Sequence, residues 1–200
     1  MPGNQKTEFL AALAKGPIDR VASHFLLERV PYLFSGDHNA YIEWKHELAS
    51  RIGVDARALC LVGSAAIGIS LNPNKNYKSF DDDSDIDVAA ISDYHFDVAW
   101  TWMRNLGSER FRLPRVAQSS IEQHRTQLVY FGAIASDQII QYMPFGRLWT
   151  EAISYVKGLA PIDGRDVNVR IYRDFSALRS YQVRNLTRLR EKFLATTEGG

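Results

Sequence analysis

Hydrophobic residues recur at helical spacing over the first quarter of the chain. Apolar side chains return every three or four positions in residues 7–15, 17–30 and 39–53. This period is typical of amphipathic helices that bury one face. Gly16, Pro31 and Gly53 stand where these segments are expected to end, and Asn39 is expected to cap the third. The pattern predicts a helical segment over residues 1–57 that packs on the rest of the protein.

Three other stretches have the pattern of β-strands. Leu59–Val62 is a continuous apolar run, Asp85–Ile91 starts with alternating acidic and apolar residues, and residues 166–174 alternate most regularly. The apolar members of this last stretch are expected to face the core: Val167, Val169 and Ile171. The opposite face carries its other side chains: Asn168, Arg170 and Tyr172.

Further helices are predicted at residues 92–106, 119–130, 148–156 and 176–194. Ser92 or Asp93 is expected to cap the first of them, and Ser119 with Glu122 has the spacing of a capping box for the second. Glycine and proline interrupt residues 132–146, and the pattern there is too irregular to predict a helix or a strand. Residues from Ala195 onward are expected to form a frayed tail.

Composition narrows the class of protein. Two hundred residues with 46% apolar content fit one domain, or one domain with a helical appendage. Cys60 is the only cysteine, which excludes a disulfide framework within one chain. The longest nearly apolar run, Leu128–Ala135, is too short to span a bilayer, and the first residues do not resemble a signal peptide. We therefore expect a cytoplasmic protein with no membrane partner.

Charge is divided unevenly along the chain. Residues 1–100 hold nine basic and fourteen acidic residues, a net charge of −5, whereas residues 101–200 hold fifteen and nine, a net charge of +6. The basic half is suited to meet phosphate groups, although most of its arginines are expected simply to lie on solvated helix surfaces.

The residues best suited to chemistry lie at Gly63-Ser64 and Asp85-Ile86-Asp87. Gly63 follows an apolar strand and permits a tight turn, and Ser64 with the peptide N–H groups of a following helix offers a site for phosphate. Asp85 and Asp87 are two positions apart on a strand, so both carboxylates point to one face. Two such carboxylates can share a hard divalent cation whose other ligands are water and substrate phosphates.

As a pair, these motifs resemble the signature of the nucleotidyltransferase superfamily, which includes polymerase-beta-like enzymes, antibiotic nucleotidyltransferases and oligonucleotide synthases. The resemblance covers roughly residues 40–175. It implies an α+β fold in which a small mixed β-sheet is flanked by helices. The nucleotidyltransferase-like core is expected at residues 58–175, between the N-terminal helical segment and a C-terminal helix and tail at 176–200. A polar loop, Leu71–Phe80, lengthens the usual gap between the two motifs.

The resemblance also implies roles for individual residues. Asp85 and Asp87 would be the catalytic acids and would bind Mg²⁺ or Mn²⁺, and Gly63 with Ser64 would bind the phosphates of a nucleoside triphosphate (NTP). The polymerase-beta-like branch carries a third acid in a strand patterned apolar-Asp-apolar-Arg-apolar. The similar segment here has Asn168 in place of that acid. Asparagine offers a metal its carbonyl oxygen but cannot act as a base.

Neighbouring residues leave alternatives open. Asp166 or Asp174 is available to compensate for the missing acid, since both lie on the face of Asn168. Arg170 either contacts the triphosphate or pairs with the acidic cluster. Two lysines of the inserted loop either cover the nucleotide or are solvated: Lys75 and Lys78.

Two other interpretations of the acidic run Asp81–Asp87 fit the sequence less well. A calcium-binding loop needs a glycine after its third acid and a glutamate at its twelfth position, where this chain has Val88 and Tyr94. A solvated acidic turn does not explain why an apolar strand follows the acids directly.

Three functional hypotheses follow from the sequence. The chain is an active metal-dependent nucleotidyltransferase that moves a nucleoside monophosphate to an acceptor hydroxyl, with Asp85 and Asp87 at its centre. Alternatively, it is a catalytically impaired relative that acts as a nucleotide-binding or regulatory module, which Asn168 favours. In the third hypothesis it is an interaction protein that docks a partner protein. The acceptor stays open among a protein, tRNA or another RNA, a small molecule and a nucleotide.

Overall fold

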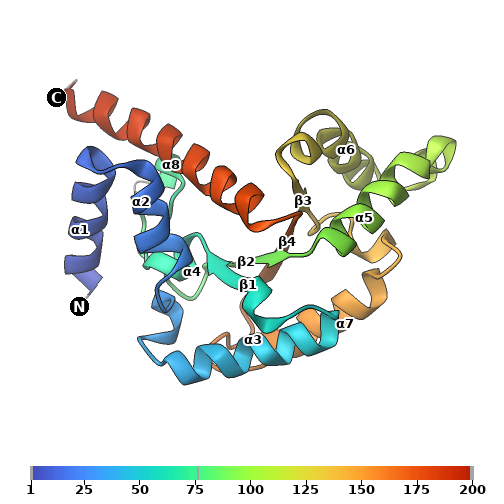
Figure 1. Cartoon of the computed structure of the whole chain (residues 1–200), viewed down its shortest axis with the longest axis horizontal. Helices are drawn as coiled ribbons and strands as arrows, with labels where there is room; N and C mark the ends of the chain where they lie inside the picture. Colours follow the sequence, from blue (N-terminus) through green and yellow to red (C-terminus); the bar gives the residue numbers. More distant parts are fainter. Residues whose placement is uncertain (1, 76, 199–200) are drawn as a thin grey trace.

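The structure, a computed structural model, describes residues 2–75 and 77–198 of the 200-residue chain. A small central β-sheet is flanked by helices, so the expected α+β class is confirmed (Figure 1). The sheet contains four strands in the order β1-β2-β4-β3. These strands are β1 (Leu59–Val62), β2 (Ile86–Ile91), β3 (Ala133–Ala135) and β4 (Val167–Tyr172). Strands β2 and β4 are parallel and the other two pairs are antiparallel, so the sheet is mixed.

Helices account for most of the remaining chain. The α-helices are α1 (Pro2–Lys15), α2 (Ile18–Ala22), α3 (His38–Ile52), α4 (Ser64–Ile67), α5 (Asp93–Asn105), α6 (Arg115–Gln123), α7 (Gly146–Lys157) and α8 (Phe175–Glu198). Wider π-helical turns continue α2 and α6, as η1 (Ser23–Leu27) and η6 (His124–Leu128). The short 3₁₀ segments include η4 (Pro73–Lys75) and η7 (Val129–Phe131).

One face of the sheet carries the main hydrophobic core. The apolar residues of β4 on this face are those predicted from its alternation: Val167, Val169 and Ile171. They pack in one cluster with Trp44 of α3, Phe96 of α5, Ile121 of α6 and Trp149 of α7. Because these side chains are almost fully buried, the four helices are fixed against a single face of the sheet.

The opposite face is covered by the start of α8. Tyr172 of β4 packs there with Leu178 of α8 in a smaller cluster. Farther along, α8 buries Leu186 and Leu189 against α1 and the helix formed by α2 and η1, where Phe9 and Leu26 lie. Figure 1 shows α8 running from the sheet to the N-terminal helices. The first helices of the chain therefore pack on the last one, and the start of α8 packs on the sheet.

The predicted boundaries fail at the first helices. The helix after Pro17 widens into a π turn at Ser23 and ends at Leu27, three residues before the predicted end. Asp37 caps α3 in place of Asn39, because its carboxylate accepts a hydrogen bond of 2.9 Å from the Ala40 amide.

Later boundaries differ as well. Helix α6 begins at Arg115, directly after Pro114, so the Ser119–Glu122 spacing lies inside a helix that has already started. Helix α8 continues to Glu198, so the prediction of a frayed tail from Ala195 onward was wrong. No glycine or proline interrupts this stretch before Gly199. Strand β3 is a three-residue edge strand in the region for which no element was predicted, and it is too short to show a period.

Candidate functional site

A tight turn at Gly63 brings the first motif against the second. Gly63 has φ 65° and ψ −144°, a conformation that residues with a side chain rarely adopt. A Cβ at this position would lie 2.8 Å from Oδ2 of Asp87. Glycine is therefore needed here for two reasons, the backbone conformation and the close approach of the Asp87 carboxylate.

The helix that follows the turn is short. Helix α4 begins at Ser64, ends at Ile67 and is terminated by Gly68 in the left-handed conformation. One turn of helix aligns few peptide dipoles, so the phosphate site expected at the start of this helix gains little from a helix dipole. This site consists of the Ser64 hydroxyl and the adjoining backbone.

Strand register places the predicted residues side by side. Val62 of β1 pairs with Asp87 of β2, and Asp87 pairs with Asn168 of β4. Asp87 and Asn168 are direct neighbours on one face of the sheet, the face that α8 covers. The six residues predicted for the site line two adjoining pockets that share Gly63 and Asp87: Gly63, Ser64, Asp85, Asp87, Asn168 and Arg170.

The first pocket, which we call the loop pocket, has a volume of about 230 Å³. Its walls are the Gly63-Ser64 turn, the acidic residues before β2 and the inserted loop, which contributes Asn72 and Lys75. The inserted loop closes on itself at its base, where the Ser70 amide donates to the Lys78 carbonyl at 2.7 Å. The pocket is therefore lined mainly by polar groups, several of them able to bind phosphate or a cation.

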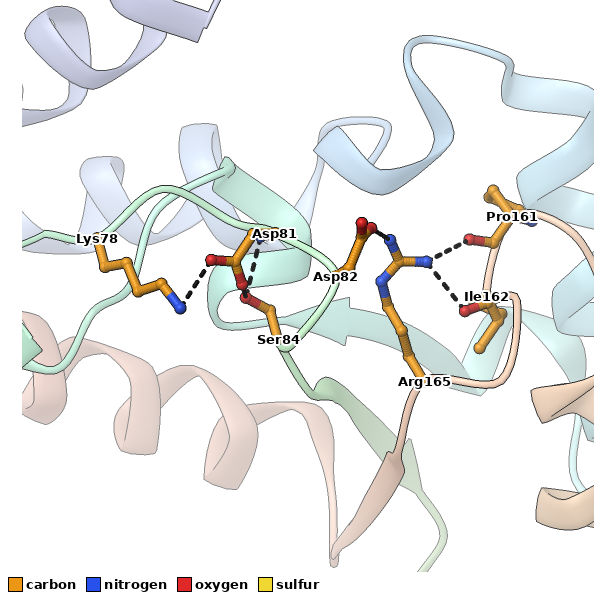
Figure 2. A network of polar contacts seen from close by, with 7 residues as sticks. All are labelled: Lys78, Asp81, Asp82, Ser84, Pro161, Ile162 and Arg165. Carbon is orange, nitrogen blue, oxygen red and sulfur yellow. Dashed lines mark hydrogen bonds and ion pairs between the residues drawn. The ribbon is translucent and has the colours of Figure 1, made fainter.

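A network of polar contacts holds the acidic loop beside this pocket (Figure 2). Asp81 accepts from Lys78 at 2.7 Å and from the Ser84 hydroxyl at 2.8 Å. Asp82 pairs with Arg165, whose guanidinium also donates to two backbone carbonyls shortly before β4. These two carboxylates are thus occupied in holding the loop. The remaining acids of the run line the loop pocket: Asp83, Asp85 and Asp87.

The second pocket, the helix pocket, lies between the sheet and α8 and has a volume of about 190 Å³. Arg170 enters it from β4, and its guanidinium donates to the Tyr181 hydroxyl of α8 and lies 4.8 Å from the centre of that ring. Buried Gln182 lines the same wall. The positive charge of Arg170 lies close enough to Asp87 to favour its ionised form.

A further carboxylate, which sequence reasoning missed, lines the helix pocket. The chain leaves β3 at Ala135, and the amide of Ser136 donates to the Val169 carbonyl of β4 at 3.4 Å. This contact brings the next residue, Asp137, into the pocket that Asp87 and Asn168 also line. The only sequence signal was an acid two positions after a short apolar stretch. It carries no information without the pairing of β3 with β4.

The two acids proposed from the sequence to replace the missing one lie elsewhere. Asp166 pairs with Lys157 at 2.6 Å, and the carboxylate of Asp174 caps α8 by accepting from the Ala177 amide at 2.7 Å. Neither acid lines the loop pocket or the helix pocket.

The electrostatics of the site centre on Asp87. Its pKa is raised above the usual value for an aspartate, chiefly because neighbouring protein atoms desolvate the carboxylate, even though the residue as a whole is exposed. The negative charges of Asp85 and Asp137 raise this pKa further, whereas Arg170 and Lys75 lower it. A bound cation would relieve the same repulsion, so the site is suited to one.

The donors fit a hard divalent metal ion. Asp85, Asp87 and Asn168 offer carboxylate and amide oxygens, which suit Mg²⁺ and Mn²⁺. Within residues 2–75 and 77–198, no three His, Cys, Asp or Glu side chains form a ready metal-binding group. Water and substrate phosphates would therefore have to complete the coordination, as is usual for Mg²⁺.

Comparison with known proteins gives no relative from which a function can be transferred. No family model, no curated protein and no solved structure matches the chain. Among the described residues, none of the helices is long and apolar enough to cross a membrane.

Proposed function

We propose that the chain has the nucleotidyltransferase fold and transfers a nucleoside monophosphate from an NTP to an acceptor hydroxyl with the help of Mg²⁺ or Mn²⁺. One observation carries the proposal. The Gly63-Ser64 turn and the Asp85/Asp87 pair come from different strands and line the same polar pocket, where the Gly63 backbone lies against the Asp87 carboxylate. This is the convergence that phosphate and metal binding require.

The loop pocket is assigned to the triphosphate. The Ser64 hydroxyl and Lys75 would bind phosphate oxygens, and Lys78 would do so less, since it already pairs with Asp81. Asp85 and Asp87 would hold the divalent cation, with the Asn168 carbonyl as a neighbouring neutral donor. When bound, the cation neutralises charge on the phosphates and makes the α-phosphorus easier to attack.

The helix pocket is assigned to the attacking group. The acceptor oxygen forms a bond to the α-phosphorus while the bond to pyrophosphate breaks, and the hydroxyl proton must leave. Asn168 cannot take this proton, because an amide is not a base at neutral pH. Asp137, which faces the same pocket, is the carboxylate placed to accept it.

A second candidate function uses the same site without chemistry. Asn168 stands where the family resemblance leads us to expect a third acid, and an amide cannot replace the charge or the basicity of a carboxylate. This substitution favours a catalytically impaired module that binds a nucleotide and acts in regulation. Such a module would keep NTP binding and lack transfer.

The test is transfer of label from α-³²P NTPs to total cellular RNA or protein, with Mg²⁺ or Mn²⁺. The proposal expects label in an acceptor with the native protein and none with the Asp85→Asn/Asp87→Asn variant. Asp97→Asn, an exposed carboxylate on α5, is the matched control and should retain transfer. Cation-dependent thermal stabilisation by a non-hydrolysable NTP without any transfer would favour the binding module. Absence of both stabilisation and transfer would favour an interaction protein.

A further inference from the structure

A third cavity adjoins the helix pocket on the other side of Tyr181. It lies between η7 and the first turns of α8 and has a volume of about 400 Å³. We call it the aromatic cleft, and its walls include Tyr130, Phe131, Arg173, Ser180, Tyr181 and Arg184. Tyr181 lines both the aromatic cleft and the helix pocket, so the two cavities meet at this side chain. Figure 1 shows α8 starting beside β3 and β4, and Arg173, the residue directly after β4, lines the cleft.

Two adjacent aromatic residues of the cleft are open to solvent. Tyr130 is 87% exposed and Phe131 is 42% exposed, and their ring centres are 5.1 Å apart. One exposed aromatic side chain is common on protein surfaces. These two rings meet edge to face, at an interplanar angle of 84°, so they do not form one flat surface. Tyr130, the more exposed of the two, leaves its own ring open for a base to stack on.

Positive charge accompanies these rings. The guanidinium carbon of Arg184 lies 3.4 Å from the centre of the Phe131 ring and 5.4 Å from that of Tyr181. Arg173 contributes a second guanidinium to the cleft. Within the described part of the chain, neither arginine forms an ion pair with a carboxylate. The carboxylate of Asp174, which also lines the cleft, is engaged in capping α8.

The helical period extends this charge along α8. Arg188 is exposed one turn beyond Arg184, so both side chains lie on the same side of the helix. Tyr181 and Asn185, also four positions apart, line the helix pocket. Arg184 lines the aromatic cleft, and Arg188 continues its positive charge one turn farther along α8.

We propose that the aromatic cleft binds the end of a single-stranded nucleic acid and directs its terminal hydroxyl past Tyr181 into the helix pocket. This inference rests on the proposed function, because it names the acceptor of that site. The open ring of Tyr130 lies near Arg173 and Arg184, neither of which pairs with a carboxylate among the described residues. This combination matches a ligand that has planar bases and phosphates. An acidic peptide would use the arginines and leave the exposed Tyr130 ring without a role.

Binding is measured separately from chemistry. The full chain is titrated into an end-labelled single strand of about 12 nucleotides, in EDTA and without NTP, and binding is measured by fluorescence anisotropy. The affinities for single-stranded RNA and DNA of one sequence, for the RNA duplex and for a mononucleotide are compared. We expect both single strands to bind more tightly than the duplex and the mononucleotide, and their affinity to fall as salt rises. Tyr130→Ala combined with Arg184→Gln should weaken binding of the single strands about tenfold or more.

Matched controls come from other surfaces. Tyr94→Ala removes an aromatic residue of α5 that is 67% exposed, and Arg147→Gln removes an exposed arginine of α7. Both should bind the single strands as the native protein does, and circular dichroism should show that every variant is folded. The inference is overturned if the native protein does not prefer single strands, or if the cleft variant binds as tightly as the controls.

Failure of this inference is distinguishable from failure of the proposed function. Label transfer to a non-nucleic-acid acceptor, with no single-strand binding, would refute the acceptor class alone. Single-strand binding that depends on Tyr130 and Arg184, with no transfer to any acceptor, would refute the enzymatic function and retain the cleft as a binding site.

Discussion

The Oδ2 atom of Asp87 lies 2.8 Å from the point that a Cβ on Gly63 would occupy. This relationship links the two motifs of the site more directly than any hydrogen bond does. The backbone of the turn and the carboxylate of the next strand approach so closely that no side chain fits between them.

Gly63→Ala should therefore damage both stability and nucleotide binding. The substitution combines a positive φ with a clash, and we expect a loss of about 2–3 kcal/mol in the free energy of unfolding. Because the carboxylate must move, stabilisation by Mg²⁺ with a non-hydrolysable NTP should be lost. Denaturant unfolding and thermal shift measure the two effects.

Gly53→Ala is the matched control for this variant. Gly53 also has a positive φ, 72°, but no atom lies within 4 Å of its added Cβ. This substitution should lower the free energy of unfolding by about 1 kcal/mol and leave nucleotide binding unchanged. Equal nucleotide binding by Gly63→Ala and native protein would contradict the assigned role of the turn.

Asp87 should make the metal-free protein less stable as pH rises. Its pKa is raised in the folded state, so between the ordinary value of 3.8 and the folded value the native state binds more protons than the unfolded state. Stability is then fully present below about 3.8 and is lost as pH rises through the folded pKa. Asp87→Asn should remove this loss and unfold at higher denaturant than the native protein at pH about 7 in EDTA.

Adding Mg²⁺ with the non-hydrolysable NTP should reverse the order of the two proteins. Only the ionised carboxylate holds the cation, so the native protein gains stability and Asp87→Asn gains little. A native protein whose metal-free stability rises with pH through this window, relative to Asp87→Asn, would show that the carboxylate is not crowded as the structure indicates.

The sequence predicted the part of the site that depends on local pattern. Alternation in residues 166–174 placed Asn168 and Arg170 on the polar face, and the Asp85/Asp87 spacing placed both acids on one side of β2. The parallel pairing that makes Asp87 and Asn168 neighbours was not readable from either strand alone. Only the family resemblance suggested that these strands lie together.

Asp137 was missed for a different physical reason. Its position follows from the pairing of a three-residue edge strand and from a contact between Ser136 and Val169, which are 33 positions apart. Helix boundaries failed where two local signals compete, as at Pro114 and the Ser119–Glu122 spacing. The pattern within one helix or strand thus predicted which face its side chains occupy, whereas contacts between elements could not be predicted from the sequence.

Asp137→Asn should separate chemistry from binding. If Asp137 accepts the proton of the attacking hydroxyl, its loss should lower kcat by roughly a hundredfold to ten-thousandfold. Cation-dependent stabilisation by a non-hydrolysable NTP should persist, because Asp85 and Asp87 remain. Single-turnover label transfer measures the first quantity and thermal shift the second.

The position of Asn168 offers a sharper version of this experiment. A carboxylate there would stand directly beside Asp87 in register. Adding Asn168→Asp to Asp137→Asn should therefore restore part of the lost rate. A transfer rate unaffected by Asp137→Asn would assign the proton to another group and remove Asp137 from the proposed mechanism.

His124 should make the position of Asp137 sensitive to acid. This imidazole is fully buried; its Nδ1 lies 2.5 Å from the Ser120 carbonyl, and its Nε2 accepts from the Ala135 amide at 2.9 Å. These partners fit the neutral ring with its proton on Nδ1, and burial lowers the pKa of His124. Protonation of Nε2 would remove the acceptor that holds the last residue of β3, two positions before Asp137.

The pKa of His124 in the folded protein is lower than the ordinary value of 6.5 for a histidine. Between these two pH values the unfolded state therefore binds more protons than the folded state does. The stability that neutral His124 contributes is present above about 6.5 and is lost as pH falls through the folded pKa. His95, whose pKa is also lowered by burial, contributes to the same dependence of stability on pH, so the test needs a residue-specific measurement.

Hydrogen exchange of the Ala135 amide, corrected for the intrinsic pH dependence of exchange, should lose protection as pH falls from about 7 to 5. His124→Gln should weaken that protection at every pH, whereas His46→Gln, an exposed control on α3, should leave it unchanged. Protection at Ala135 that is independent of both pH and His124 would show that strand pairing alone holds the chain that carries Asp137.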